Sequence, residues 1–413
     1  VVTNKLRKLS AEIGELKVEL DSTDPTAIIR LLDVDTDSVL NKADGYDTTN
    51  ARRTALREML FESIGVVTGN TAFQSRSMIW KGTRREIDVV FGNLADATDI
   101  TDLVLQSATN VKIVLDFPFD PEGTRSAKDD VARAGNYVAD NPATRTMCWI
   151  PQFFSPRSMT DLGNYVVHQH VLTGDNFDRY ASHLSAQDRP VAKQLLASRR
   201  DGLRDRLRNA LRQAYRVDEP TDAMVVPALE VDEQFVSLNP TFKPVRPVAV
   251  DLRDAFEKLA SQHLAHLYPG HPEFEEEVKT ADLRAVLGEI TRAATMRSAR
   301  LEVPVGPLRK QLRRIANPLK LGTMHEAHYT PETTWSEHVV RKLAEEAPAV
   351  LTVGVLRKWT DEPIVRGLPR EVQDLVILAI AAETDRVLMR GGAVLSGDIG
   401  RLDDDIELHT QTP

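Results

Sequence analysis

The sequence predicts an α+β protein that is predominantly helical and contains one small α/β unit. Two short runs of β-forming residues, 111–116 and 146–150, flank a helical pattern over 126–138, which indicates the α/β unit. Elsewhere apolar residues recur every three or four positions, the spacing of amphipathic helices. The 413 residues are enough for two or three domains, at about 150 residues per domain.

Composition limits the classes of function. The formal net charge of −9 argues against a protein that coats nucleic acid by bulk charge, although local basic patches remain open. The single cysteine, Cys148, excludes disulfides within the chain and fits a reducing cytoplasm. No apolar run approaches the ~18 residues that a membrane span needs. The chain starts Val-Val-Thr without Met, so we expect it to be part of a longer polypeptide.

Residues 1–75 are expected to form an amino-terminal helical region. Leucine and isoleucine at helical spacing predict a helix over 1–20, either packed on its own domain or ending a coiled coil. Asp24-Pro25 is expected to open a second, short helix. A third helix over 49–65 is expected to end at Gly65.

Residues 76–155 form the expected α/β unit with a hairpin. Strands are predicted at 78–80 and 87–91 around the turn KGTRR, and a helix at 96–108. The run 111–116 then ends in an acid, and Ser126 can cap a helix before the strand at 146–150. Strand, helix and strand with short connections predict a parallel βαβ unit.

The remaining chain is expected to be helical. Residues 156–250 comprise a helical region, with helices at 161–172, 175–184 and 185–215, and a Pro-rich connection from 217. Residues 251–413 are expected to be a helical domain that ends in a hairpin around Gly391-Gly392. Its helices are predicted at 251–267, 280–300, 307–315, 335–344, 353–359 and 369–384.

Helices followed by a hairpin occur twice, which predicts winged-helix-like modules. Basic residues lie near the first hairpin tip and on the helix at 307–315, and basic side chains can contact phosphate. The predicted nucleic-acid-binding residues are Lys81, Arg84, Arg85, Arg309, Lys310, Arg313 and Arg314. The alternatives are an ordinary hairpin with solvated charges and, for the second module, a helical bundle with a β flap.

Asp116 and Asp120 are the strongest candidates for chemistry in the α/β unit. An apolar strand that closes on an acid is similar to a Walker B strand, but Pro118 stands near where a second acid is needed. The sequence contains no GxxxxGK[ST], GxGxxG or GxSxG motif. We therefore expect no catalytic residue, and expect both aspartates to fix the following turn. An enzyme with an acidic site at this strand end is the alternative.

Metal-binding and nucleophilic sites have little support. His263, His266 and His271 cluster without the further ligands that zinc requires, so no metal site is predicted. Cys148 lies between Met147 and Trp149 in a predicted buried strand, where a thiol is usually inert.

Several segments, in this order, resemble the large ATPase-like proteins of bacterial BREX and phage-growth-limitation defence systems, the PglY and BrxC type. They are WKGTRREIDVVFGNL, VLDFPFDPEG followed by Asp129-Asp130, WIPQFFS, DLGNYVVHQHVL, LSAQDRPVAKQLLASRR and GLPREVQDLVILAIAAETDR. The resemblance covers about residues 75 to 410 and carries over no catalytic residue.

The resemblance implies a role in phage resistance. In that family the P-loop lies in the amino-terminal part of a longer protein, so this chain is expected to lack the P-loop region. It implies no cofactor in this part, with ATP and Mg²⁺ bound by the whole protein. The expected function is a non-catalytic interaction or scaffold region in the cytoplasm, which contacts other defence-system subunits and DNA.

Overall fold

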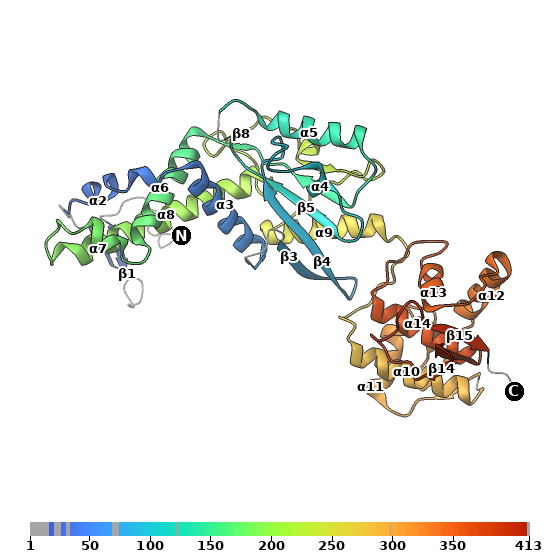
Figure 1. Ribbon diagram of the computed structural model, residues 1–413. Coiled ribbons are helices and arrows are strands. Elements are labelled where there is room, and N and C mark those ends of the chain that lie inside the picture. Colours follow the sequence, from blue (N-terminus) through green and yellow to red (C-terminus); the bar gives the residue numbers. More distant parts are fainter. Residues whose placement is uncertain are drawn as a thin grey trace. The chain divides into compact units, whose positions relative to one another are not determined.

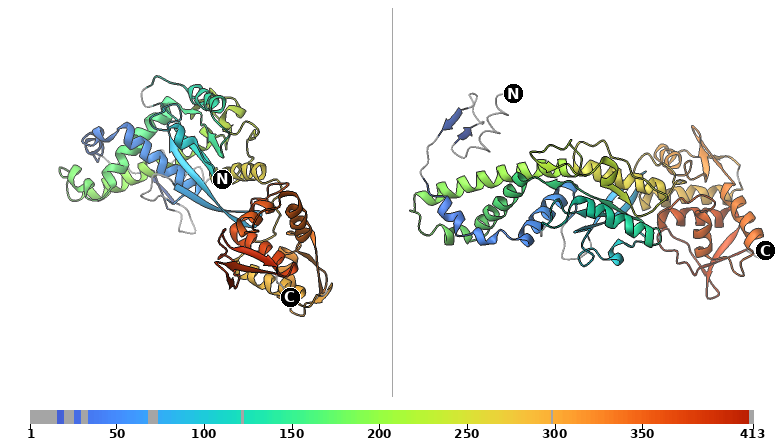
Figure 2. Two further views of the ribbon diagram at one scale, coloured as in Figure 1. Left: turned by 45° about the vertical axis from the view of Figure 1, so that its right-hand side comes forward. Right: turned by 90° about the horizontal axis from the view of Figure 1, so that it is seen from above.

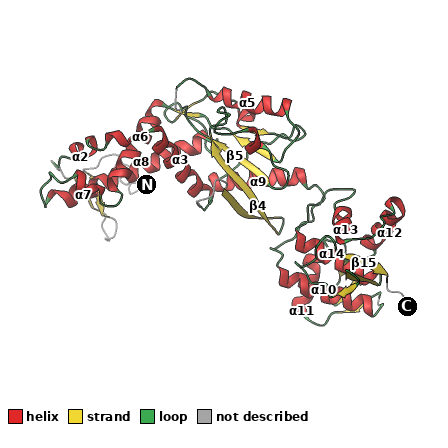
Figure 3. Cartoon of the chain, viewed as in Figure 1, coloured by secondary structure: helices red, strands yellow, loops and turns green. Residues whose placement is uncertain are grey.

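The computed structural model describes residues 16–19, 26–29, 34–67, 74–120, 123–297 and 299–410 (Figure 1). The chain divides into two compact units: residues 1–76 with 87–260, and residues 77–86 with 261–413. Each unit combines helices with small sheets, and most of the ordered structure is helical (Figure 3). The predicted fold class, α+β and predominantly helical, is confirmed.

Two short strands replace helical structure near the amino terminus. Strands β1 (Leu16–Glu19) and β2 (Thr26–Ile29) pair antiparallel, with Leu16 opposite Ile29. The helices predicted for 1–20 and after Asp24-Pro25 are therefore wrong at these positions. The β-branched residue types here favour extended backbone over a helix. The other residues of these two predictions, up to residue 33, lie outside the described part of the chain.

A five-stranded sheet with the order β3-β4-β5-β6-β9 forms around β5. The strands are β3 (Gln74–Trp80), β4 (Thr83–Gly92), β5 (Val111–Asp116), β6 (Thr146–Trp149) and β9 (Phe235–Ser237). Strands β4, β5 and β6 are parallel, with Val89 opposite Ile113 and Ile113 opposite Met147, whereas β9 is antiparallel to β6. Every residue of β5 is buried, as expected for a central parallel strand.

Two helical connections complete the parallel part of this sheet. Helix α4 (Asp102–Leu105) joins β4 to β5 and is much shorter than the predicted helix over 96–108. Helix α5 (Ala127–Asp140) joins β5 to β6, which confirms the predicted βαβ unit. Ser126 and Asp129 form a capping box at the start of α5, so the predicted cap is also confirmed.

The other helices of the first unit form a bundle beside the sheet. They are α2 (Asp37–Asn41), η1 (Asp44–Tyr46), α3 (Thr49–Ile64), α6 (Pro156–Leu172), α7 (Asn176–Tyr180) and α8 (Asp188–Ala214). Helix α6 packs against α8, the long yellow-green helix in the right-hand view of Figure 2. Gly65 ends α3 with a positive φ of 75°, as the sequence predicts.

The Pro-rich connection contributes strands to the first unit. Strand β8 (Val225–Val226) pairs with β7 (Phe153–Phe154), and η2 (Val231–Gln234) leads into β9 at the sheet edge. Gln152 anchors this segment, because its side chain accepts hydrogen bonds from Ala228 N and Leu229 N at 2.8 and 3.0 Å.

The second unit surrounds the buried helix α14 (Arg370–Glu383), in which all residues from Val376 to Ala381 are buried. Helix α9 (Leu252–Leu267) leads into this unit. The other helices are α10 (Thr280–Thr295), α11 (Gly306–Ile315), α12 (Thr334–Glu346) and α13 (Val353–Thr360). None of the described helices is long and apolar enough to cross a membrane.

Two three-stranded sheets flank these helices. One has the order β10-β12-β11, from Leu301–Glu302, His328–Pro331 and Gly322–Met324. The other has the order β14-β13-β15, from Ala393–Leu395, Arg386–Arg390 and Glu407–Thr410. The predicted carboxyl-terminal hairpin is thus present, with positive φ at both Gly391 and Gly392.

Candidate functional site

Two buried carboxyl groups lie at the carboxyl end of β5, where parallel sheets often place functional side chains. Asp116 Oδ1 accepts a hydrogen bond from Leu94 N at 2.9 Å, and Asp130 Oδ1 accepts one from Ala95 N at 3.0 Å. Both aspartates have 0% exposure. The two carboxyl groups therefore hold the loop after β4 against β5 and α5.

Asp120 and Arg125 close the loop that follows β5. Asp120 Oδ2 accepts hydrogen bonds from the backbone N–H groups of Thr124 and Arg125, the latter at 2.8 Å. The Arg125 guanidinium donates to Asp130 Oδ1, and its Nε lies 3.5 Å from Asp120 Oδ1. Asp120 thus fixes the turn, as the sequence indicates, and Arg125 supplies positive charge to the buried carboxyl pair.

The carboxyl pair binds a proton well above the usual range for aspartate. Burial and, to a smaller extent, the neighbouring Asp116 carboxylate together raise the pKa of Asp130 to about 9. Burial also raises the pKa of Asp116. Among the described residues, Asp116 Oδ2 and Asp130 Oδ2 are buried without a hydrogen-bond partner, and the two carboxyl groups are close enough to share a proton. We infer that near pH 7 Asp130 is the protonated donor and Asp116 the acceptor, which leaves one negative charge opposite Arg125.

The chemistry open to this cluster is limited by its burial. A general acid or base must come within hydrogen-bond reach of its substrate, and neither Asp116 nor Asp130 is exposed. Within the described ranges, no group of three or more His, Cys, Asp or Glu side chains is arranged to hold a metal ion. Burial likewise raises the pKa of the Cys148 thiol, which keeps it protonated. The cluster can store a proton and fix two loops.

The three basic residues of the first hairpin belong to the second unit and contact other residues of that unit. Arg84 Nη2 donates to Glu277 Oε1 at 2.8 Å, and Arg85 Nη2 donates to Gly367 O at 2.7 Å. Lys81 Nζ lies 5.1 Å from the ring centroid of the preceding tryptophan. Arg84 is the most exposed of these three, since 65% of its side chain is accessible.

The tip of this hairpin is packed into the second unit. Phe274 N donates to Lys81 O at 3.2 Å, and Val278 N donates to Gly82 O at 2.8 Å. A Cβ atom on Gly82 would lie 2.5 Å from Phe274 Cβ and 2.6 Å from Glu276 O. The tip is therefore held by backbone hydrogen bonds and a close approach that only glycine allows.

The four basic residues of α11 are also engaged within the second unit. Lys310 Nζ donates to Glu276 Oε1 at 2.8 Å, and Arg314 contacts both Glu276 and Asp282, the latter at 2.6 Å. Arg309 and Arg313 donate to backbone carbonyl oxygens of residues 304 and 324–326. The hairpin tip and α11 thus meet at the adjacent residues Glu276 and Glu277.

The three histidines that cluster in sequence do not form one open site. His263 is fully buried in α9, and His271 is 5% exposed. His271 Nε2 lies 3.3 Å from Thr83 Oγ1 at the hairpin tip, and its Nδ1 is 2.6 Å from Pro272 O. Burial lowers the pKa of His271 to about 3, so its ring is neutral at physiological pH.

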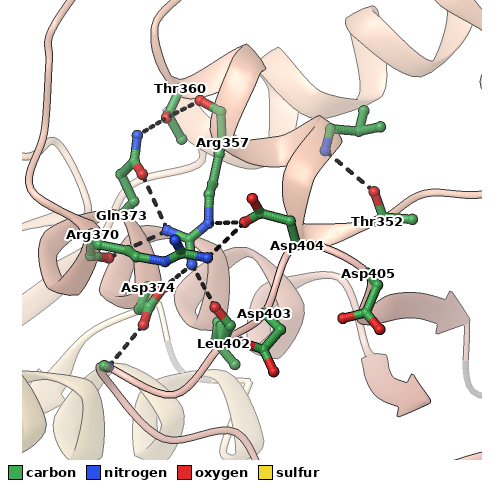
Figure 4. Close-up of polar contacts among 12 residues, drawn as sticks. Thr352, Arg357, Thr360, Arg370, Gln373, Asp374, Leu402, Asp403, Asp404 and Asp405 are labelled. Carbon is green, nitrogen blue, oxygen red and sulfur yellow. Dashed lines mark hydrogen bonds and ion pairs between the residues drawn. The ribbon is translucent and has the colours of Figure 1, made fainter. Parts of the chain in front are cut away.

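A buried arginine network joins α13, α14 and the loop before β15 (Figure 4). Arg357 Nη2 donates to Asp374 Oδ1 at 2.7 Å and to Leu402 O at 2.8 Å, while its Nε donates to Asp404 Oδ1 at 2.8 Å. Asp374 Oδ2 accepts a hydrogen bond from Gly400 N at 2.8 Å. No local sequence pattern marks this network, because its members are up to 47 positions apart.

Among the cavities away from these clusters, one in each unit has several polar side chains in its lining. The larger, about 510 Å³, lies in the second unit between α12, the 363–366 loop and the turn after α11. The smaller, about 270 Å³, lies in the first unit between α3 and α6, beside Tyr46 and His170, whose rings stack with centroids 3.4 Å apart.

Comparison with protein families gives two matches along the chain. Residues 39–268 match the model described as PglY fourth domain, and residues 281–381 match the model described as BREX System ATPase PglY protein 5th domain. The first match alone covers more than half of the chain. No solved structure matches the chain.

Proposed function

Because this chain belongs to the PglY family of BREX antiviral defence proteins, we propose that it is a non-catalytic interaction and scaffold region of a larger phage-defence ATPase-like protein. Its partners are other subunits of the defence system, in the cytoplasm. The observation that supports this most directly is the sealed carboxyl pair. The residues best placed for chemistry, Asp116 and Asp130, hold loops together with 0% exposure.

Nucleotide chemistry is assigned to the rest of the protein. The chain contains no Walker A sequence, so no loop of this kind is present to cradle phosphates. ATP and Mg²⁺ would then be bound by other parts of the ATPase-like protein. The role of these two units is to present surfaces that join that activity to partner subunits.

Catalytic assays on the full chain distinguish this proposal from an enzyme with an acidic site near Asp116 and Asp120. We expect no hydrolysis of ATP by the purified chain, and direct binding to at least one purified subunit of its defence system by biolayer interferometry. Hydrolysis that disappears in Asp120→Asn, with unchanged circular dichroism, would favour the enzyme instead.

DNA contact through the seven predicted cations remains a prediction. A phosphate group would have to displace an existing partner, such as Glu277 from Arg84 or Glu276 from Lys310. Both pairs are exposed, and exposed ion pairs are worth only about 0–1 kcal/mol, so the exchange costs little at each cation but reduces the gain from each phosphate contact. Protein partners need no such exchange and are the better supported class.

A further inference from the structure

We propose that the 510 Å³ cavity of the second unit binds a peptide segment of a partner protein that carries one carboxylate beside apolar side chains. The inference deepens the proposed scaffold function and rests on it, because it names the kind of partner surface that one site would recognise. We call this the α12 cavity; its lining residues used in the argument are Lys320, Trp335, His338, Arg341, Ile364 and Arg366.

The α12 cavity has the size and mixed lining of a ligand site. Specific pockets usually measure about 300–1,000 Å³ and combine an apolar wall with a few polar groups. Here Pro272, Pro318 and Pro363 contribute rigid apolar surface, and Ile364 is 52% exposed at the rim. An isoleucine half-exposed beside a cavity offers apolar area that a partner side chain can cover.

The charges of the lining favour an anionic ligand. Three cationic side chains of the lining, Lys320, Arg341 and Arg366, outnumber its one acid, Glu337, although Arg341 Nε also lies 3.8 Å from Glu345 Oε1 outside the lining. This is a local excess of positive charge in a chain whose formal net charge is −9. Lys320 is exposed, and within the described ranges it forms no ion pair and no side-chain hydrogen bond. Its ammonium group is thus available to an incoming carboxylate.

The two arginines are held in place before any ligand arrives. Arg366 Nη1 donates to Thr360 O at 2.7 Å, and its guanidinium carbon lies 4.9 Å from the ring centroid of Trp335. Arg341 Nη2 is 2.8 Å from His338 Nδ1. Because His338 Nε2 is 2.9 Å from Trp359 O, its proton belongs on Nε2, and Nδ1 accepts from Arg341. Preorganised donors reduce the entropy lost on binding.

Lys320 has a backbone conformation that is uncommon for a lysine. Its φ is 55°, in the left-handed region that favours glycine or asparagine. The side chain of this lysine lines the α12 cavity. Strained residues are often kept where the side chain is used, which agrees with a binding role.

A peptide fits this site better than nucleic acid does. Glu345 and Glu346 lie on the same helix as Arg341, and Glu362 precedes Pro363 of the lining. A phosphodiester chain carries a charge at every nucleotide and would run from the cationic lining onto these carboxylates. A single carboxylate flanked by apolar side chains matches a cavity with cationic groups on one side and prolines and Ile364 on the other.

Selection from a random peptide library tests the proposal, because it requires no identified partner. The full chain is immobilised, and phage-displayed 12-residue peptides are enriched against it. We expect the enriched peptides to share one Asp or Glu next to apolar residues. A synthetic peptide of the enriched sequence should lose at least about tenfold in affinity when that acid is changed to its amide, measured by isothermal titration calorimetry.

Variants of the chain assign the binding to the α12 cavity. Lys320→Gly, which suits the positive φ, and Arg341→Glu should each weaken the synthetic peptide by about tenfold or more. Arg401→Glu is the matched control, because Arg401 is an exposed cation of the same unit outside the lining, and its substitution should leave affinity unchanged.

Three results would overturn the inference: no enrichment above background, enriched peptides without an acid, or binding that Lys320→Gly and Arg341→Glu do not weaken. Competition by a 20-nucleotide oligothymidine at equal concentration would also overturn it, in favour of nucleic acid. If the chain still binds defence-system subunits in any of these cases, the scaffold function stands and only the site is wrong.

Discussion

The stability of the first unit is expected to fall as pH rises, and Asp130→Asn is expected to remove this fall. Asp130 has a pKa of about 9 in the folded chain, whereas an aspartate in an unfolded chain has a pKa of about 3.9. Between these values the folded state keeps a proton that the unfolded state has released. The folded state therefore binds more protons, and wild-type stability falls as pH rises from about 4 to about 9.

The magnitude follows from the width of this window. Each pH unit inside it changes the free energy of unfolding by about 1.4 kcal/mol, so the contribution from pH 5 to pH 8 is on the order of 4 kcal/mol. Asparagine mimics the protonated acid: Oδ1 can still accept from Ala95 N, and Nδ2 can donate to Asp116. The free energy of unfolding of the variant, measured relative to that of the wild type, should therefore rise by this amount between pH 5 and pH 8.

The measurement is urea unfolding at pH 5, 6, 7 and 8. Hydrogen exchange of the β5 and α5 amides follows the unfolding, so that the stability of the first unit is measured separately from that of the second. Asp129→Asn is the matched control, because hydrogen bonds from Ser126 lower the pKa of that exposed acid. Its contribution is present above pH 4 and is lost only in more acid solution, so this control should show a constant difference from pH 5 to pH 8. A difference between wild type and Asp130→Asn that does not change with pH would refute the buried proton.

Three further outcomes are expected. Arg357→Met should destabilise the second unit by about 3–5 kcal/mol in urea unfolding, because it leaves Asp374 buried without its cation; a loss below 1 kcal/mol would contradict this account. Gly82→Ala should destabilise the same unit by more than about 1 kcal/mol, since the added Cβ meets Phe274 in a backbone with φ of 74°, whereas Gly391→Ala, at a hairpin tip with no atom within 4 Å, should cost less. If the predicted DNA contact is real, Lys310→Gln should reduce the slope of log K against log salt by about 0.9 in a fluorescence titration, and an unchanged slope would remove Lys310 from the interface.

Local signals in the sequence predicted much of the first unit. The apolar runs at 111–116 and 146–150 are buried parallel strands because both faces of that sheet are covered. Gly65 and Ser126 marked helix ends because their chemistry acts within a few residues. By contrast, β9 comes from a segment interrupted by prolines, and its pairing with β6 depends on contacts almost 90 positions apart.

The candidate site could be predicted only in part. Asp116 and Asp120 were identified from their place at a strand end, but the partner of Asp116 is Asp130, which the spacing alone does not indicate. Asp130 lies on α5, and only the path of the loop after β5 brings it beneath Leu94 and Ala95. The high proton affinity follows from burial, which is a property of the folded chain.

Pairing with a carboxylate, rather than the density of charge along the chain, separates Arg84 and Lys310 from Lys320 of the α12 cavity. All seven predicted cations lie in basic runs of the sequence. In the folded chain, however, Arg84 and Lys310 each form an ion pair with a nearby glutamate. Lys320 stands alone in sequence between Leu319 and Leu321 and carries no pattern. Coulomb attraction is already used where a carboxylate is within 3 Å, and is available where none is. A mutational scan for partner binding should therefore respond more strongly at Lys320 than at Lys310, although a count of neighbouring basic residues would rank them in the opposite order.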